Sequence, residues 1–437
     1  MQPTPNRPAS SHREPKRTSF SRTHPGYPAC FQNEQNIPRF KKLGYHSLEE
    51  DSEECFTSNV APPYRDVITP PYYTLDWISP PHSVSNGDSD ASHPRAPDDE
   101  SEQLPCTSSS DAAISNMSLY FSGRPTIFPA EDFDPAKDAA EICKAMKGSD
   151  IDSRSIISVL SKRSNEQRVA ISEKYVELNK KEIERSLTKS GYGNFEVLVV
   201  LSLESLQDTI AFSLNEYVKG LDTDENILIQ GIVPYPNSFM REVVKSYRKQ
   251  FNADVIIDLF RHKRGDFRTI LMALLQGIRD ENESTDMKEM WEDADVLYKA
   301  SAIPLSPNAE IFTRILTQRS FLQIKQIAQY YQEKYGISLQ QCINNGKFGG
   351  YNDTLIALIR YATDKDDLLA EWFHRSIQET ATDDWALMQL TLGRSEIDLQ
   401  DVKDAYSRKY GKPLTKAIAG ATSGEYKRFL MAVIGCQ

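Results

Sequence analysis

Gly424-Glu-Tyr-Lys, close to the end of the chain, decides the fold, because a tetrad of the same kind occurs at three earlier places. The four tetrads are Gly193-Asn-Phe-Glu, Gly265-Asp-Phe-Arg, Gly349-Gly-Tyr-Asn and Gly424-Glu-Tyr-Lys. Each one begins 18 positions after a tyrosine, and these tyrosines are Tyr175, Tyr247, Tyr331 and Tyr406. Two markers that keep the same spacing four times indicate four copies of one unit.

The length of the unit indicates how it folds. The copies can be given the origins Gly148, Gly220, Pro304 and Glu379, which are 72, 84 and 75 residues apart. Counted from these origins, the tyrosine is at position +27 and the tetrad begins at +45 in every copy. An arginine stands at +15 in three copies, whereas the second copy has Tyr235 there. A period this long, with helical patterning inside it, predicts several helices per copy and copies that stack on a shared core.

Longer stretches of the last and first copies resemble a known protein family. Those of the last copy are Arg394-Ser-Glu-Ile-Asp-Leu-Gln-Asp-Val, Tyr410-Gly-Lys-Pro-Leu and Thr422-Ser-Gly-Glu-Tyr-Lys-Arg. Those at the start are Thr126-Ile-Phe-Pro-Ala and Arg163-Ser-Asn-Glu-Gln-Arg. Together they resemble the annexins, over residues 124–437. The resemblance implies an all-α fold of four stacked five-helix annexin-type repeats forming a curved disc, with loops on its convex face that bind calcium and anionic phospholipid.

On this resemblance the chain divides into a leader and four repeats. The parts are residues 1–123 (a Pro/Ser-rich leader), 124–205 (repeat 1), 206–283 (repeat 2), 284–364 (repeat 3) and 365–437 (repeat 4). Sixteen of the 24 prolines lie before residue 121, and the leader lacks helical or strand periodicity, so it is predicted to be disordered. A chain beginning near Gly123 should therefore unfold at nearly the temperature of the full chain.

The leader contains charge blocks and one candidate partner motif. Residues 1–42 carry a net charge of +6 and residues 49–111 a net charge of −12, so the two blocks could attract each other. Pro70, Pro71 and Tyr73 match the Pro-Pro-x-Tyr pattern that WW domains bind. Such short motifs also arise by chance, so an unstructured spacer without a partner is the alternative.

Several other function classes find no support in the sequence. No catalytic constellation is present, so the chain is not expected to be an enzyme. The repeats are close to charge balance, which argues against nucleic-acid binding. No apolar run approaches 18 residues, and the six cysteines have no paired spacing. We expect a cytoplasmic protein that associates with membranes only peripherally.

The family's calcium sites are degenerate in this chain. The principal family site combines a Lys-Gly-x-Gly-Thr loop with a carboxylate about 42 positions after the first glycine, because calcium takes six to eight oxygen ligands. None of the four loops here has both glycines. The four carboxylate positions hold Ser190, His262, Gly346 and Ala421. High-affinity calcium binding is therefore expected to be lost, and no cofactor is expected to be required.

A weak calcium site in repeat 2 is an open alternative. Its candidate residues are Gly220, Asp222, Asp224 and Glu225. Acidic residues just before a helix are more often N-caps and first-turn charges than metal ligands. Calcium is therefore a possible but weak ligand.

A basic cluster occupies the vacated carboxylate position of repeat 2. It consists of Arg261, His262, Lys263 and Arg264. Direct contact of these side chains with lipid phosphate could replace the calcium bridge, whereas an ordinary solvated basic face is the alternative.

Two functions remain for the whole chain. One is a peripheral protein that binds anionic phospholipid with weak or no calcium dependence, and the other is a membrane- or cytoskeleton-linked scaffold whose disc and leader bind protein partners.

Overall fold

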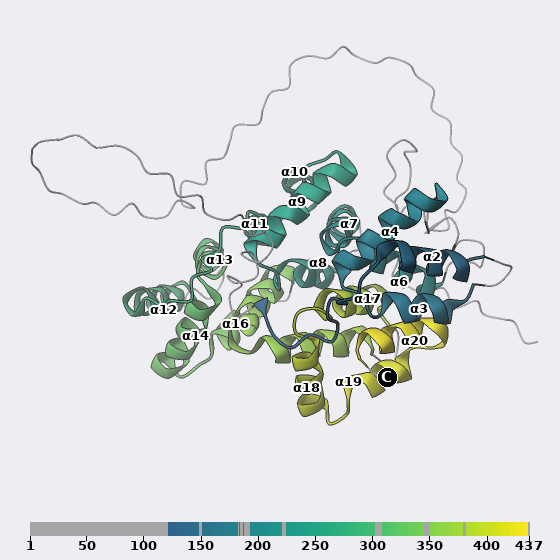
Figure 1. Ribbon diagram of the computed structural model, residues 1–437. Helices are drawn as coiled ribbons and strands as arrows, with labels where there is room; N and C mark the ends of the chain where they lie inside the picture. The colour runs from purple at the N-terminus through teal and green to yellow at the C-terminus, as the bar shows by residue number, and fades with distance from the viewer. Residues whose placement is uncertain are drawn as a thin grey trace, which may run out of the picture.

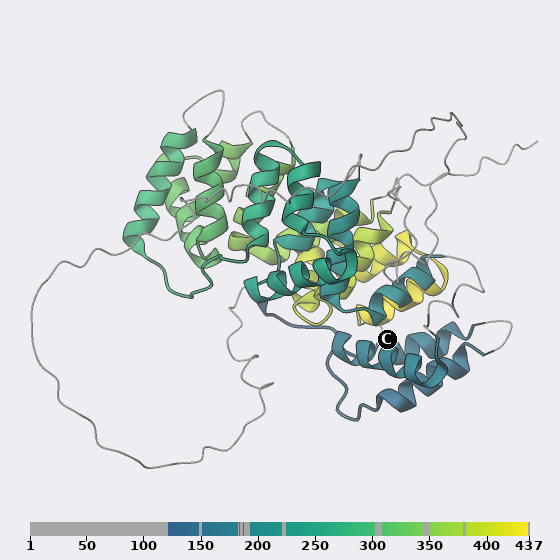
Figure 2. The same cartoon turned by 90° about the horizontal axis from the view of Figure 1, so that it is seen from above.

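The computed structural model describes residues 121–147, 151–181, 183, 187, 193–220, 224–301, 308–344, 349–378 and 382–435. In this part of the chain the regular structure is helical, without strands, so the predicted all-α class is confirmed. The helices form four bundles that follow one another along the chain (Figure 1). Helices α12–α14 lie at one end of the molecule and α2–α4 at the other (Figures 1 and 2).

The helices are assigned to the bundles in chain order. The first bundle contains α2 (Pro135–Ala145), α3 (Ser153–Leu160), α4 (Asn165–Asn179) and α6 (Asn194–Leu203). The second contains α7 (Leu206–Lys219), α8 (Glu225–Ile232), α9 (Asn237–Phe251), α10 (Val255–His262) and α11 (Gly265–Leu275). The third contains α12 (Met287–Ser301), α13 (Ala309–Gln318), α14 (Phe321–Tyr335), α15 (Leu339–Ile343) and the first part of α16 (Gly350–Ser376). The fourth contains the rest of α16, α17 (Asp384–Arg394), α18 (Leu399–Tyr410), α19 (Leu414–Ala421) and α20 (Gly424–Val433). The two parts of α16 meet at Asp364, whose backbone is not helical.

The register tyrosines lie on the corresponding helix of each bundle and belong to the core. They are Tyr175 on α4, Tyr247 on α9, Tyr331 on α14 and Tyr406 on α18, and none is more than 3% exposed. A buried phenol requires a hydrogen-bond partner. The Tyr247 hydroxyl, for example, donates to Oδ2 of Asp258 over 2.6 Å. Position +27 therefore marks a core position with a polar anchor.

Three of the register glycines have left-handed backbone angles. The φ angles of Gly265, Gly349 and Gly424 are 59°, 138° and 62°. A side chain is strained in this region, whereas glycine adopts it without cost. Each of these residues begins or directly precedes the last helix of a repeat, so position +45 marks the tight turn into that helix.

One side of the disc carries the starts of several helices. Glu225, the first residue of α8, accepts a hydrogen bond from the N–H of Gly350, the first residue of α16, with Oε2 and N 2.7 Å apart. Asp224 and Asp383 are the N-caps of α8 and α17. Burial raises the pKa of Asp383, and the nearby charge of Asp224 adds to the rise. We name the side on which α8, α16 and α17 begin the loop face.

The +15 positions of repeats 2 and 4 meet inside the molecule. Arg394 is 1% exposed and donates to the two carboxylate oxygens of Asp398 over 2.8 and 2.5 Å. It also donates to the carbonyl oxygen of Pro234 over 3.2 Å, and its guanidinium lies 5.9 Å from the ring centre of Tyr235. An arginine in place of Tyr235 would bring a second buried cation to this point. The departure of repeat 2 from the pattern therefore has a structural cause.

Residues 121 and 122, which the sequence analysis places in the leader, contact the folded part of the chain. Phe121 is 4% exposed and packs against Phe321, with ring centres 5.9 Å apart. Lys365 donates to the carbonyl oxygen of Ser122 over 2.8 Å. A chain that begins at Gly123 would therefore lack this buried side chain. The rest of the leader lies outside the described residues.

Candidate functional site

The basic cluster lies where α10 ends and α11 begins. Arg261 and His262 complete the last turn of α10, and Lys263 and Arg264 connect it to α11. The N–H of Lys263 donates to the carbonyl oxygen of Leu259 over 2.9 Å, which closes α10. The four side chains are thus presented at one corner between two helices.

Three of the four side chains are exposed. They are those of Arg261, His262 and Arg264. The side chain of Arg261 is 68% exposed, and its guanidinium approaches Asp258 only to 3.8 Å. Lys263 is half-buried, and burial lowers its pKa while the charge of Glu225 opposes this. Because Glu225 begins α8, the cluster and the start of α11 belong to the loop face.

Two exposed apolar side chains adjoin the cluster, and the sequence alone does not reveal them. Ile257 and Phe260 on α10 are 47% and 54% exposed. The guanidinium of Arg268 on α11 lies 4.6 Å from the ring centre of Phe260. Apolar residues at helical spacing usually face the core, as Val255 and Leu259 of the same helix do. The sequence offered no signal that separates the two pairs.

The described carboxylates among the candidate calcium residues of repeat 2 lie at the starts of helices, where they accept hydrogen bonds from backbone N–H groups. The structure describes Gly220, Asp224 and Glu225, while Asp222 lies outside the described residues. Oδ1 of Asp224 accepts the N–H of Asn226 over 2.8 Å, which is an N-cap. Oε2 of Glu225 accepts a hydrogen bond from the N–H of Gly350. Both carboxylates therefore already satisfy backbone amides.

The calcium loops of the four repeats are described only in part, because residues 148–150, 221–223, 302–307 and 379–381 lie outside the described residues. Of the four carboxylate positions, His262 and Ala421 are described, whereas Ser190 and Gly346 are not. Calcium is held by six to eight oxygen atoms, and neither an imidazole nor a methyl group supplies one. In the described ranges, no group of three or more His, Cys, Asp and Glu side chains is placed to hold a metal ion. Among the described residues of repeat 2, Asp224 and Glu225 are the candidate carboxylate donors, and both already accept backbone N–H groups.

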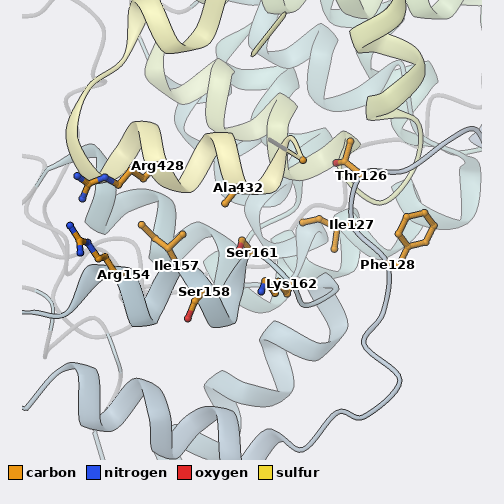
Figure 3. A pocket seen from close by; sticks show the side chains of 11 residues that line it. Thr126, Ile127, Phe128, Arg154, Ile157, Ser158, Ser161, Lys162, Arg428 and Ala432 are labelled. Carbon is orange, nitrogen blue, oxygen red and sulfur yellow. The ribbon is translucent and has the colours of Figure 1, made fainter. Parts of the chain in front are cut away.

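A second basic surface lies between repeats 1 and 4. A hollow of about 510 Å³ is lined by residues of α3 and α20 and by residues 126–128. Arg154 and Arg428 lie next to each other at one end, and Lys162 lies further along it (Figure 3). Arg428 forms an ion pair with Glu425. Because other repeats build this hollow, it is separate from the basic cluster of repeat 2.

Two remaining expectations concern the leader motif and membrane spans. Pro70, Pro71 and Tyr73 lie outside the described residues. In the part of the chain that the structure describes, no helix combines the length and apolarity needed to cross a bilayer.

Comparison with protein families and curated proteins gives consistent matches. The family model described as Annexin matches residues 137–201, 292–358 and 369–433, which lie in repeats 1, 3 and 4. Annexin A7 of Homo sapiens is 32% identical over 337 residues, covering 75% of this chain and 69% of that protein. Annexin B22 of Schistosoma mansoni is 31% identical over 334 residues, covering 71% of this chain and 92% of that protein.

Solved structures agree with this assignment. A structure described as annexin III has a TM-score of 0.70 at 31% identity and covers 73% of this chain and 99% of its own. One described as calcium-bound annexin (Sm)1 has a TM-score of 0.65 at 30% identity and covers 72% and 93%. The four-bundle fold, the register of buried tyrosines and these matches lead to one conclusion: the chain belongs to the annexin family, whose members are peripheral, calcium-dependent phospholipid-binding proteins.

Proposed function

We propose that this annexin is a non-enzymatic cytoplasmic protein that binds anionic phospholipid membranes peripherally, with weak or no dependence on calcium. The observation that carries the proposal is the basic cluster from Arg261 to Arg264 on the loop face of repeat 2. The phospholipid binding of the family supports the membrane part. The imidazole of His262 at the position of the family's calcium-binding carboxylate supports the calcium part.

Direct binding of phosphate by the cluster is chemically sound. A calcium bridge joins protein carboxylates to lipid phosphates through a dication. Guanidinium groups can make charge-assisted, bidentate hydrogen bonds to the same phosphates without a metal. Arg261 and Arg264 are exposed and are available for such bonds. Near an anionic membrane each cation contributes about 1 kcal/mol.

Changing Arg261 and Arg264 together to alanine should weaken binding to phosphatidylserine-containing vesicles in chelator about 30-fold, because two cationic contacts are lost. Both side chains are exposed, so the fold should persist. Vesicle co-sedimentation measures the affinity. Added salt should reduce the difference between variant and unaltered protein, since it screens the membrane's field.

A matched control removes two charges elsewhere in repeat 2. Lys245 and Lys249 are exposed on α9, which joins the end of α8 to the start of α10 and so lies away from the loop face. The Lys245→Ala, Lys249→Ala variant should keep most of its affinity. An equal loss in both variants would mean that net charge, and not the cluster, determines binding, and the proposal would then be wrong.

Titration calorimetry should show no calcium isotherm with a micromolar Kd, because the described donors in repeat 2 already cap helices. A clear micromolar isotherm would refute the calcium part of the proposal. Asp222→Ala and Asp224→Asn would then locate the site, since asparagine keeps the N-cap acceptor at position 224 while removing its charge.

A scaffold for protein partners is a second candidate function, favoured by α12. On this helix Met287, Trp291 and Tyr298 are 50%, 48% and 41% exposed. Large apolar side chains on a surface often mark protein interfaces. The leader motif would add a WW-domain partner. Failure of the unaltered protein to bind any anionic vesicle, with or without calcium, would favour this function.

A further inference from the structure

The exposed pair Ile257 and Phe260 shares one face of α10. Residues three apart on a helix are neighbours, and both side chains leave about half of their surface in solvent, at 47% and 54%. Phe260 lies in the last turn of α10, two residues before the helix ends at His262 on the loop face. The apolar pair and the basic cluster therefore form one continuous surface.

The charges around this pair are mainly cationic. The guanidinium of Arg268 stacks on Phe260 at 4.6 Å, and the exposed Arg261 and Arg264 flank it in sequence. Of the acids on and beside α10, Asp258 is 4% exposed and accepts from Tyr247. Asp254 is paired with Arg248 over 2.6 Å, while Asp266 in the first turn of α11 remains exposed.

An aromatic and an aliphatic side chain bordered by arginines is the composition of an interfacial membrane anchor. Apolar side chains of such surfaces enter the boundary between head groups and acyl chains, about 5–10 Å deep, while cations remain at the phosphates. A groove on a protein partner would also take an apolar pair. The surrounding arginines favour an anionic bilayer, because they complement a continuous negative surface.

We propose that Ile257 and Phe260 insert below the head groups of an anionic bilayer while Arg261, Arg264 and Arg268 hold the phosphates. The inference rests on the proposed function and adds an apolar contribution that needs no calcium. Membrane binding of this annexin then consists of two parts, an electrostatic one that salt weakens and an apolar one that salt does not.

Phe260→Trp tests the insertion directly. In chelator, vesicles of phosphatidylcholine and phosphatidylserine should shift the emission of the new tryptophan to shorter wavelength, relative to the unaltered protein. Brominated acyl chains should quench it. Ile337→Trp is the matched control, because Ile337 is 40% exposed and lies just before the start of α15, the end remote from the loop face. Its emission should not change.

Ile257→Ser with Phe260→Ser should lower vesicle affinity about tenfold at every salt concentration, because only apolar contact is removed. A thermal melt confirms that the variant is folded. If the unaltered protein binds vesicles but this double variant binds equally well and Phe260→Trp shows no shift or quenching, the inference is wrong and the proposed function stands. If the unaltered protein binds no vesicles in chelator, both are wrong.

Discussion

Replacing Arg394 with alanine should lower the free energy of unfolding by about 3–5 kcal/mol, the largest single-site effect that we expect in this chain. Arg394 and Asp398 are 1% and 0% exposed, and two hydrogen bonds join them. Removing the guanidinium leaves the carboxylate of Asp398 buried with only Lys365 nearby, at 3.0 Å. It also leaves the carbonyl of Pro234 without this donor. Denaturant unfolding followed by circular dichroism measures the loss.

The loss of stability caused by Arg394→Ala should depend on pH in a defined direction. Burial alone would raise the pKa of Asp398, but the charge and hydrogen bonds of Arg394 lower it overall. The pair therefore stabilises the fold above the unfolded pKa of about 3.9, and this contribution disappears as the pH falls through the lower folded value. In the alanine variant Asp398 can protonate to relieve its burial. The stability difference should consequently narrow from neutral pH toward about pH 4.

A double variant separates the charge effect from the loss of packing. Arg394→Met with Asp398→Leu replaces both charges by apolar groups, so no buried charge loses its main partner. It should be more stable than Arg394→Ala alone. If Arg394→Ala costs less than about 1 kcal/mol while the double variant costs more, the buried pair does not determine stability at this point.

The sequence predicted the positions that recur in every copy. The tyrosine at +27 and the glycine at +45 are set by requirements inside one repeat, namely a buried phenol and a left-handed turn. Such requirements return with each copy and are therefore visible as a register. Tyr235 breaks the +15 pattern because its neighbour Arg394 comes from another repeat, and spacing along the chain does not contain that contact.

The candidate site was predictable only in part. The sequence placed Arg261 to Arg264 in one turn, and the charge of Glu225 is close enough to act on the pKa of Lys263, which locates this turn on the loop face. The exposure of Phe260 could not be predicted, because helical spacing does not say which of several apolar faces is covered. The same limit applies to Phe121, since its partner Phe321 lies 200 positions further along the chain.

Phe121→Ala should lower the free energy of unfolding by about 3 kcal/mol, because a buried aromatic ring is replaced by a cavity. The ring packs against Phe321 and Tyr361, with ring centres 5.9 and 6.4 Å away. Phe121→Leu should lower the free energy of unfolding less, since leucine fills much of the volume of the phenylalanine ring. Thermal and denaturant unfolding of the full chain measure both variants.

Two truncations extend this test to the whole leader. A chain that begins at residue 119 keeps Phe121 and should be nearly as stable as the full protein, whereas a chain that begins at residue 123 should show the same loss as Phe121→Ala. In the chain that begins at residue 123, Arg124 should still attach the N-terminal end to α18, because its guanidinium forms ion pairs with Asp401 and Asp404 over 2.6 and 2.7 Å. Equal stability of the two truncations would show that the ring of Phe121 adds nothing to the core. A further loss in both, relative to the full chain, would mean that residues before 119 also stabilise the disc.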